Sequence, residues 1–231
     1  MMKNSVNTDT LRFLLRLTEE ELHDFLSTQL KKYYKNVITS QAYILAEGTI
    51  PICLVAHLDT VFENQKKDII TINNIITTKN QGLGADDRAG VYMILKILEK
   101  GFRPHVIFTL GEEKNARGAF SIIKKYNYFP FDIKFFIELD RKGRNECVFY
   151  DCHNSAFQKY IESFGYIRNS GTYTDIRVLC PAWGIAGVNV SCGYYHEHTL
   201  REYLNLTDLD YSLNKVIKIL EGYEDIPKFS F

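Results

Sequence analysis

Apolar residues along this chain fall into short continuous runs that alternate with longer segments of helical spacing. Runs of strand length occur near residues 42–47, 51–57, 105–110, 133–139, 146–150 and 185–190. Segments with apolar residues at helical spacing lie among them, near 87–100, 117–125, 154–164 and 208–221. This alternation predicts an α/β fold, a three-layer α/β/α sandwich in which helices cover both faces of a central mixed, mostly parallel sheet.

Two further regions complete the expected fold. N-terminal helices are expected over about residues 8–34, and the second of them opens with a capping box that begins at Thr18. A β-branched stretch at 69–78 predicts a hairpin whose turn is formed by Asn73 and Asn74. Both regions lie outside the main alternation of strands and helices, so we expect them to pack around it.

Three polar motifs stand where apolar runs stop. They are VAHLDTVF at 55–62, GLGADDRAG at 82–90 and TLGEEKNARG at 109–118. Because the carboxyl ends of parallel strands meet at one edge of a sheet, we expect the motifs to share that edge. His57 and Asp59 are two residues apart on an extended chain and therefore point the same way. A carboxylate beside a metal-binding imidazole is typical of zinc sites, because it fixes the tautomer.

Two pairs of neighbouring acids follow. Asp86 and Asp87 open a predicted helix, where one carboxylate suffices as a cap. A carboxylate has two oxygens, so it can bridge two metal ions about 3.5–4 Å apart. Glu112 and Glu113 follow a predicted strand, and a buried pair of like charges needs compensating positive charge. The alternatives are an ordinary helix cap for the first pair and a solvated loop for the second.

The last candidates are an acid at the end of the run IKFFIEL and two histidines in GYYHEHTLREYL, which are Asp140, His196 and His198. The ordered set His-x-Asp-Thr, Gly-Ala-Asp-Asp-Arg-Ala-Gly, Gly-Glu-Glu, a strand-terminal Asp and His-Thr-x-x-Glu-Tyr resembles the di-zinc exopeptidase superfamily. The resemblance is closest to the branch of peptidase T, aminoacylase and glutamate carboxypeptidase. It covers roughly residues 50–210.

This resemblance implies a two-metal centre. It implies that Asp86 bridges the two ions, that one site is completed by His57 and Asp140, and that the other is completed by Glu113 and a late histidine. The implied cofactor is two Zn²⁺ ions, for which Co²⁺ or Mn²⁺ could substitute. The resemblance also implies a cis peptide bond after the bridging aspartate.

The late metal ligand is interpreted as His198, because the family pattern places its ligand just before a small hydroxyl residue. His196 would then contact substrate or lie in a solvated loop. The resemblance further implies that Glu112 is the general base, which takes a proton from water and returns it to the leaving amine. Asp59 is assigned to the catalytic machinery through the histidine beside it.

Substrate contacts are expected from a second set of residues. The segment SGTYTDIRVL at 170–179 resembles a Gly-Thr-x-x-Asp segment near the substrate of the family, which implies contacts from Thr172, Thr174 and Asp175. A plain helix cap at Asp175 is the alternative. Arg88 and Arg117 lie close to the acidic cluster in sequence, where an arginine either binds a carboxylate or is a solvated salt-bridge partner.

Composition excludes several classes of function. The chain carries 28 basic and 28 acidic residues without a basic stripe, which argues against nucleic acid as a partner. No apolar run approaches the ~20 residues needed to cross a bilayer, and the N-terminus lacks a signal-peptide stretch, so we expect no membrane partner. Five scattered cysteines without paired spacing predict reduced thiols and a cytoplasmic location.

The chain departs from the family in one respect. The aminoacylase and peptidase T branch carries a second domain, used for lid or dimer contacts, between the strand-terminal Asp and the last His. Here only 57 residues, 141–197, separate Asp140 from His198, and their pattern is that of ordinary core elements. We therefore expect residues 1–231 to form a single catalytic domain without a lid, which would leave an open cleft.

The sequence therefore predicts a metal-dependent hydrolase of amide bonds in small substrates, with an aminopeptidase as the first choice. Its substrate would be a short peptide or an N-acyl amino acid. An N-acyl amino acid deacylase or a carboxypeptidase is the alternative within the enzyme class. An alternative of another class is a non-catalytic or partner-dependent binding module on the same fold. The oligomeric state is left open.

Overall fold

The central feature of the fold is a mixed β-sheet, seen in a computed structural model that describes residues 6–62 and 67–231. Among these residues, eight strands form the larger sheet, and the four at its centre (β6, β3, β7 and β10) run parallel. The strands, in spatial order, are β1 (Val37–Thr39), β2 (Tyr43–Ala46), β6 (Pro104–Thr109), β3 (Ile50–His57), β7 (Phe135–Arg141), β10 (Gly187–Ser191), β8 (Glu146–Val148) and β9 (Ile167–Arg168). The mostly parallel sheet predicted from the sequence is confirmed.

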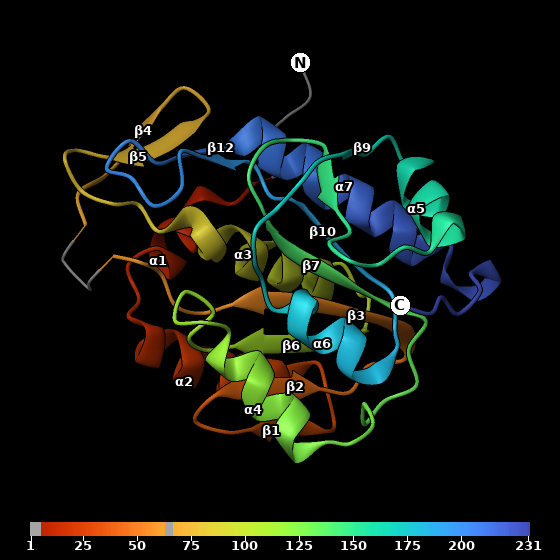
Figure 1. Cartoon of the computed structure of the whole chain (residues 1–231). Coiled ribbons are helices and arrows are strands. Elements are labelled where there is room, and N and C mark those ends of the chain that lie inside the picture. Colours follow the sequence, from red (N-terminus) through yellow and green to blue (C-terminus); the bar gives the residue numbers. More distant parts are fainter. Residues whose placement is uncertain (1–5, 63–66) are drawn as a thin grey trace.

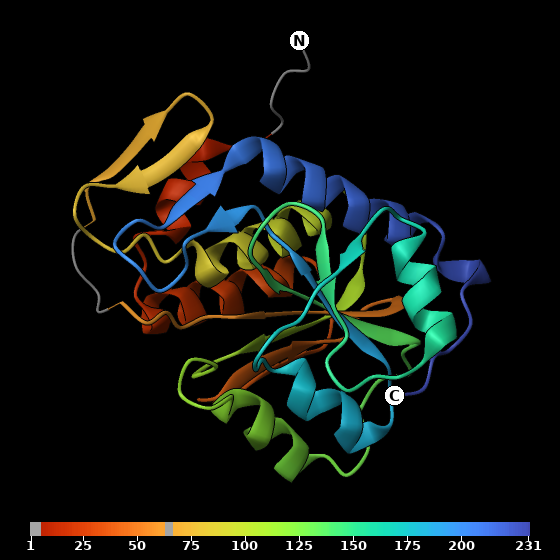
Figure 2. The ribbon, with the colours of Figure 1, turned by 45° about the horizontal axis from the view of Figure 1, so that its top comes forward.

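Helices cover both faces of this sheet (Figures 1 and 2). One face is covered by α1 (Thr8–Leu14), α2 (Glu19–Gln29), α3 (Ala85–Glu99), α5 (Ser155–Glu162) and α7 (Leu206–Glu221). The other face is covered by α4 (Arg117–Lys125) and α6 (Ile176–Trp183). Two 3₁₀ turns, η1 (Leu30–Lys32) and η2 (Tyr223–Asp225), are also present. Within the described ranges, no helix has both the length and the apolar character that a membrane crossing requires.

The packing of β3 on both of its faces explains why its residues before His57 are apolar. Its residues Ile52 and Leu54 pack into the core beneath α3, whereas Cys53 and Val55 pack on the opposite side beneath α4 and α6. Successive side chains of a strand point to opposite faces, so a strand covered on both faces needs apolar residues at nearly every position. This continuous run brings β3 to its carboxyl end at His57.

A smaller sheet lies beside the main one. It consists of β11 (Tyr194–Tyr195), β12 (Tyr203–Asn205), β5 (Ile75–Thr78) and β4 (Ile69–Ile72), in that order. The hairpin β4–β5 turns at Asn73 and Asn74 as predicted, with Asn73 in the left-handed region at φ 53°. The sequence pattern did not reveal β11 or β12, because they are two and three residues long and depend on pairing with β5.

Local capping signals agree with the helix starts. Thr18 and Glu21 form the predicted capping box, in which each side chain accepts a hydrogen bond from the backbone N–H of the other residue. The helix α6 was expected only through the alternative of a helix cap at Asp175, and it contains Pro181 in its interior. Proline is disfavoured inside helices, so the local sequence gives little sign of this one.

Candidate metal centre

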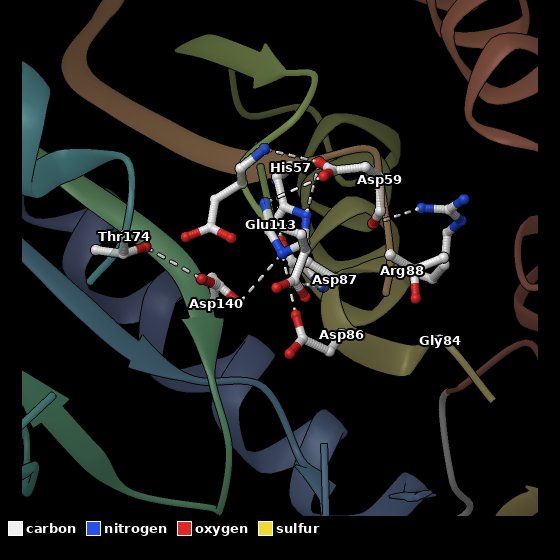
Figure 3. A network of polar contacts seen from close by, with 12 residues as sticks. His57, Asp59, Gly84, Asp86, Asp87, Arg88, Glu113, Asp140 and Thr174 are labelled. Carbon is white, nitrogen blue, oxygen red and sulfur yellow. Dashed lines mark hydrogen bonds and ion pairs between the residues drawn. The ribbon is translucent and has the colours of Figure 1, made fainter. Parts of the chain in front are cut away.

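The centre begins at the carboxyl end of β3, where His57 is almost fully buried. Its Nδ1 lies 3.3 Å from Oδ1 of Asp59. Its Nε2 lies 3.0 Å from Oδ1 of Asp86 and 3.6 Å from Oδ1 of Asp140 (Figure 3). The imidazole therefore has one nitrogen on a supporting carboxylate and the other facing two further carboxylates, which suits a metal ligand.

The two aspartates at the start of α3, Asp86 and Asp87, have different roles. Gly84 has a positive φ of 70°, and the Asp86–Asp87 peptide bond is cis, as the resemblance implied. Both aspartates have non-helical backbone angles, so the regular helix begins after them. Asp87 accepts hydrogen bonds from the backbone N–H groups of Gly90 at 3.0 Å and His57 at 3.2 Å. Asp87 is thus the cap, and Asp86 is left to face the cleft.

Asp86 lies between two histidines. Its Oδ1 faces His57, and its Oδ2 lies 3.2 Å from Nε2 of His198. The same nitrogen of His198 lies 2.7 Å from Oε1 of Glu113. Two donor sets therefore meet on one carboxylate: the first adds His57 and Asp140, and the second adds His198 and Glu113.

Asp59 holds the loop that carries the two glutamates. Its Oδ1 accepts hydrogen bonds from the backbone N–H groups of Gly111 at 2.9 Å and Glu112 at 3.0 Å, and its Oδ2 accepts one from Glu113 at 3.1 Å. Burial opposes ionisation of Asp59, but the hydrogen bonds with His57 and with these N–H groups outweigh it and lower its pKa to about 2. Asp59 remains charged and fixes both His57 and the loop.

Two other carboxylates of the cluster, Glu112 and Asp140, have too little compensating positive charge. Burial, together with repulsion from Asp140, raises the pKa of Glu112 to about 9. Burial, together with the charge of Asp86, raises the pKa of Asp140 to about 6. A divalent cation would supply the missing positive charge.

The geometry of the donors also fits a cation. Donor atoms of His57, Asp86 and Glu113 lie within 4.8 Å of one another, as do donor atoms of His57, Asp87 and Asp140. Asp87 is the weaker candidate in the second group because its two oxygens already accept backbone hydrogen bonds. The imidazole and carboxylate donors present here suit zinc, cobalt or manganese.

A cleft of about 320 Å³ opens onto these donors. Opposite charges meet at its wall, where Nζ of Lys142 lies 2.5 Å from Oε1 of Glu197. Arg141 and Asn115 also line the cleft. A substrate in the cleft would thus meet a carboxylate, able to bind an amine, and cations, able to bind a carboxylate.

The expected substrate contacts lie in different places. Thr174 is fully buried behind the cleft, where its hydroxyl donates a hydrogen bond to Oδ2 of Asp140 at 3.1 Å. Asp175 is also fully buried, accepts a hydrogen bond from the hydroxyl of Thr109, and does not cap α6 with its side chain. Of the residues expected from this segment, Thr172 lines the cleft, together with the neighbouring Tyr173.

Two other expected contacts are also outside the residues that line the cleft. His196 is exposed, with its ring 5.7 Å from the ring of Tyr203. Arg117 lines a separate cavity between α2 and α4. His198, in contrast, lines the cleft beside the acids.

Arg88 was expected to bind a substrate carboxylate or to be a solvated ion-pair partner, and the structure shows that it is neither. It is almost fully buried, and its guanidinium donates to the backbone carbonyl oxygens of Leu58, Asp59 and Leu17. It therefore holds the chain that follows His57. Burial lowers the pKa of Arg88 to about 10, so it stays charged at neutral pH.

Sequence reasoning assigned no role to two residues that shape the centre. Glu202 is buried and accepts hydrogen bonds from the backbone N–H groups of Gly84 at 2.6 Å and Asp86 at 3.0 Å. Tyr194 donates a hydrogen bond from its hydroxyl to Oδ1 of Asp140 at 3.0 Å. The sequence signal for Glu202 is its place in the His-Thr-x-x-Glu pattern that locates His198.

Comparisons with known proteins place the fold. No protein-family model matches the chain, and no curated protein matches it by sequence. Among solved structures, it is similar to the aminopeptidase PepT of Bacillus cereus, with TM-score 0.80, 14% identity, and coverage of 96% of this chain and 99% of the other. It is also similar to a tripeptidase of Staphylococcus aureus, with TM-score 0.76, 14% identity, and coverage of 96% and 98%.

A third similar structure is the TET1 peptidase of Pyrococcus horikoshii, described as assembling into a tetrahedron or a large octahedral shell. The TM-score is 0.68 at 13% identity, with coverage of 92% of this chain and 98% of the other. At such low identity these likenesses show a shared α/β fold, which agrees with the sandwich predicted from the sequence.

Proposed function

We propose that this protein is a metal-dependent hydrolase of amide bonds in small substrates, and specifically an aminopeptidase that uses two Zn²⁺ ions. The observation that carries the proposal is the position of Asp86, whose two oxygens face His57 and His198 at 3.0 and 3.2 Å. A carboxylate shared between two imidazole-containing donor sets is the arrangement that a pair of bridged ions requires.

The proposed ligands are those that the sequence singled out. One ion would be held by His57, Asp86 and Asp140, and the other by Asp86, Glu113 and His198. When bound, the ions supply Lewis acidity, which lowers the pKa of water and polarises an amide carbonyl. Asp59 keeps the imidazole of His57 oriented through the contact at its Nδ1.

Glu112 is the proposed general base. Its side chain lines the cleft beside the metal ligands, and no hydrogen-bond donor among the described residues engages its carboxylate. A carboxylate free of such contacts can accept a proton from water and deliver it to the leaving amine. The pKa of about 9 reflects burial without a cation, and positive charge in the cleft would bring it down.

Two observations support a peptide as substrate and its amino end as the site of attack. The similar solved structures are named as aminopeptidases or peptidases. In the cleft, Glu197 is next to the proposed ligand His198 and could bind a free α-amine. Its ion-pair partner Lys142, together with Arg141, could bind carbonyl or carboxylate oxygens.

We further propose that the chain acts without a lid domain. Between Asp140 and His198, each described strand belongs to one of the two sheets, and each described helix packs on the larger sheet. The cleft would therefore depend on its own wall, such as the Lys142–Glu197 pair, for substrate contacts.

The experiment is mass spectrometry of products after zinc- or cobalt-loaded protein is incubated with short peptides and N-acyl amino acids. We expect loss of single N-terminal residues, and the released fragment shows which end is attacked. Glu112→Gln should retain both ions but lose about 10²–10⁴-fold in rate. Glu221→Gln, which changes an exposed acid of α7 outside the cleft, is the matched control. Equal turnover by wild type and Glu112→Gln, or no turnover despite two bound ions, would refute the proposal.

A further inference from the structure

A second cavity, of about 610 Å³, lies between α2 and α4 and shares no lining residue with the metal cleft. We call it the α2–α4 groove and define it by its charged walls: one carries Glu19, Glu20 and Asp24, and the other carries Lys114 and Arg117. Both helices are labelled in Figure 1. Its volume is in the range of small-molecule sites.

The charges of the two walls do not neutralise each other. Among the described residues, no salt bridge within 4.0 Å joins an acid of the α2 wall to Lys114 or Arg117, and neither cation has another ion-pair partner. Opposite charges held apart across a groove produce a field that favours a ligand with a cation at one end and an anion at the other.

The half-buried Glu19 supports the same reading. Burial raises its pKa, nearby Asp59 adds to the effect, and Lys114 and Arg88 only partly offset it. This carboxylate therefore lies in a partly dry position without a direct counter-ion. A ligand ammonium group would supply one.

We propose that the α2–α4 groove binds a small zwitterion, a free amino acid or a short peptide. Its ammonium group would lie against Glu19 and Glu20, and its carboxylate against Lys114 and Arg117. The guanidinium can bind a carboxylate with two parallel hydrogen bonds, and the lysine adds a point charge. This binding does not depend on the proposed peptidase function.

The groove and the metal cleft lie on the two sides of one loop. Six residues of the segment 111–117 are divided between the two cavities: Gly111, Lys114 and Arg117 line the groove, whereas Glu112, Glu113 and Asn115 line the cleft. A Cβ at Gly111 would lie 3.3 Å from the Cβ of Arg117, so the arginine stem packs on this glycine.

This contact gives the groove a route to the metal centre. The N–H of Gly111 donates to Asp59, which also holds His57. A ligand that draws Arg117 into the groove would act on the segment that positions Glu112 and Glu113. Since coupling between two sites is reciprocal, the zwitterion and the metal ions would change each other's affinity by the same factor. This second step rests on the proposed metal centre.

Calorimetric titration of chelator-treated protein tests the binding without turnover. The probes are glycylglycine, N-acetylglycylglycine, which lacks the cation, and glycylglycinamide, which lacks the carboxylate; glycine and triglycine then separate amino acid from peptide. We expect saturable binding of the free dipeptide, with both blocked forms weaker by about tenfold or more. Arg117→Gln and, independently, Glu20→Gln should each weaken the dipeptide, while Arg117→Lys should restore part of the affinity.

Two controls locate the site. Lys124→Gln removes an exposed cation from the same helix outside the groove and should leave binding unchanged. His198→Ala disrupts the metal cleft and should also leave binding unchanged. The proposal is overturned by blocked dipeptides that bind as well as the free one, by binding insensitive to Arg117→Gln, by binding lost in His198→Ala, or by no saturable binding up to about 10 mM.

Discussion

At the scale of single residues, hydrogen-bond donors decide which buried carboxylates carry charge. Asp59 and Glu112 are both buried, yet their pKa values move in opposite directions, to about 2 and about 9. Asp59 has three backbone N–H donors and an imidazole. For Glu112, burial and repulsion from other acids outweigh the charge of His57. One residue is thereby suited to hold the structure, and the other to exchange protons.

Asp59→Asn tests the holding role. The amide replaces one accepting oxygen with a donor, which would face a backbone N–H of the segment 111–113 or the ring of His57. We expect the free energy of unfolding to fall by about 3 kcal/mol, as for a buried hydrogen bond to a charged group, and metal affinity to fall as well. Denaturant unfolding and metal titration measure both.

The control for this substitution is Asp151→Asn. Asp151 is exposed and paired with Arg177 only at 3.4 Å, so its loss should cost less than about 1 kcal/mol. If Asp59→Asn lowered the free energy of unfolding as little as this control does, Asp59 would not hold the loop.

At the scale of elements, close packing of α3 on β7 sets the depth of the centre. A Cβ on Gly90 would lie 2.1 Å from the carbonyl oxygen of Leu139 and 2.6 Å from the carboxylate of Asp87. Only glycine allows the helix to approach the strand this closely. Asp86 on the approach to α3 and Asp140 on β7 can therefore face the same imidazole nitrogen.

Gly90→Ala sets two effects against each other. Alanine favours a helix interior by about 1 kcal/mol over glycine. The overlap with Leu139 cannot be relieved by a side-chain rotation, and overpacking of this kind costs about 1–3 kcal/mol or more. We expect net destabilisation in thermal unfolding and weaker metal binding, because α3 must move away from β7.

Gly222→Ala provides the opposite case. Gly222 has φ −93°, and no neighbouring atom lies within 4 Å of the place that a Cβ would occupy, so alanine should be neutral or stabilise by up to about 1 kcal/mol. If both variants changed stability in the same direction, the close approach at Gly90 would not be the cause.

At the scale of the whole molecule, the centre accumulates negative charge that either protons or metal ions must compensate. Burial raises the pKa of Asp175 from 3.8 to about 7 and that of Glu202 from 4.5 to about 7, although neither is a proposed ligand. A carboxyl with a raised pKa binds its proton more tightly when the protein is folded. Its contribution to stability is therefore present below the unfolded pKa and is lost as the pH rises through the folded value.

The metal-free protein should accordingly become less stable between about pH 5 and about pH 8. Added zinc or manganese should raise the melting temperature more at the upper pH, since binding displaces protons from its ligands and the ions supply the missing positive charge. Thermal unfolding with chelator and with metal, at both pH values, measures this. A metal-free protein more stable at about pH 8, or a metal effect that shrinks with pH, would contradict it.

Local sequence determined a large part of this protein. The periodicity of apolar residues predicted most strands and helices of the central sandwich, because one element is decided by a few consecutive residues. It missed β1, β9 and α6, which are short. The same short range covers the capping box at Thr18 and the turn at Asn73 and Asn74. The order of the motifs also indicated which acids and histidines meet at the edge of the sheet.

Tertiary structure alone decided how those side chains are held. Glu202 accepts hydrogen bonds from the backbone N–H groups of Gly84 and Asp86, which precede it by 118 and 116 positions. Arg88 donates a hydrogen bond to the carbonyl oxygen of Leu17, which lies 71 positions before it. Such contacts depend on the path of the whole chain, which no local pattern encodes. For the same reason, the unpredicted strand β12 pairs with the hairpin that was predicted at 69–78, and Arg117 lies in the α2–α4 groove instead of the metal cleft.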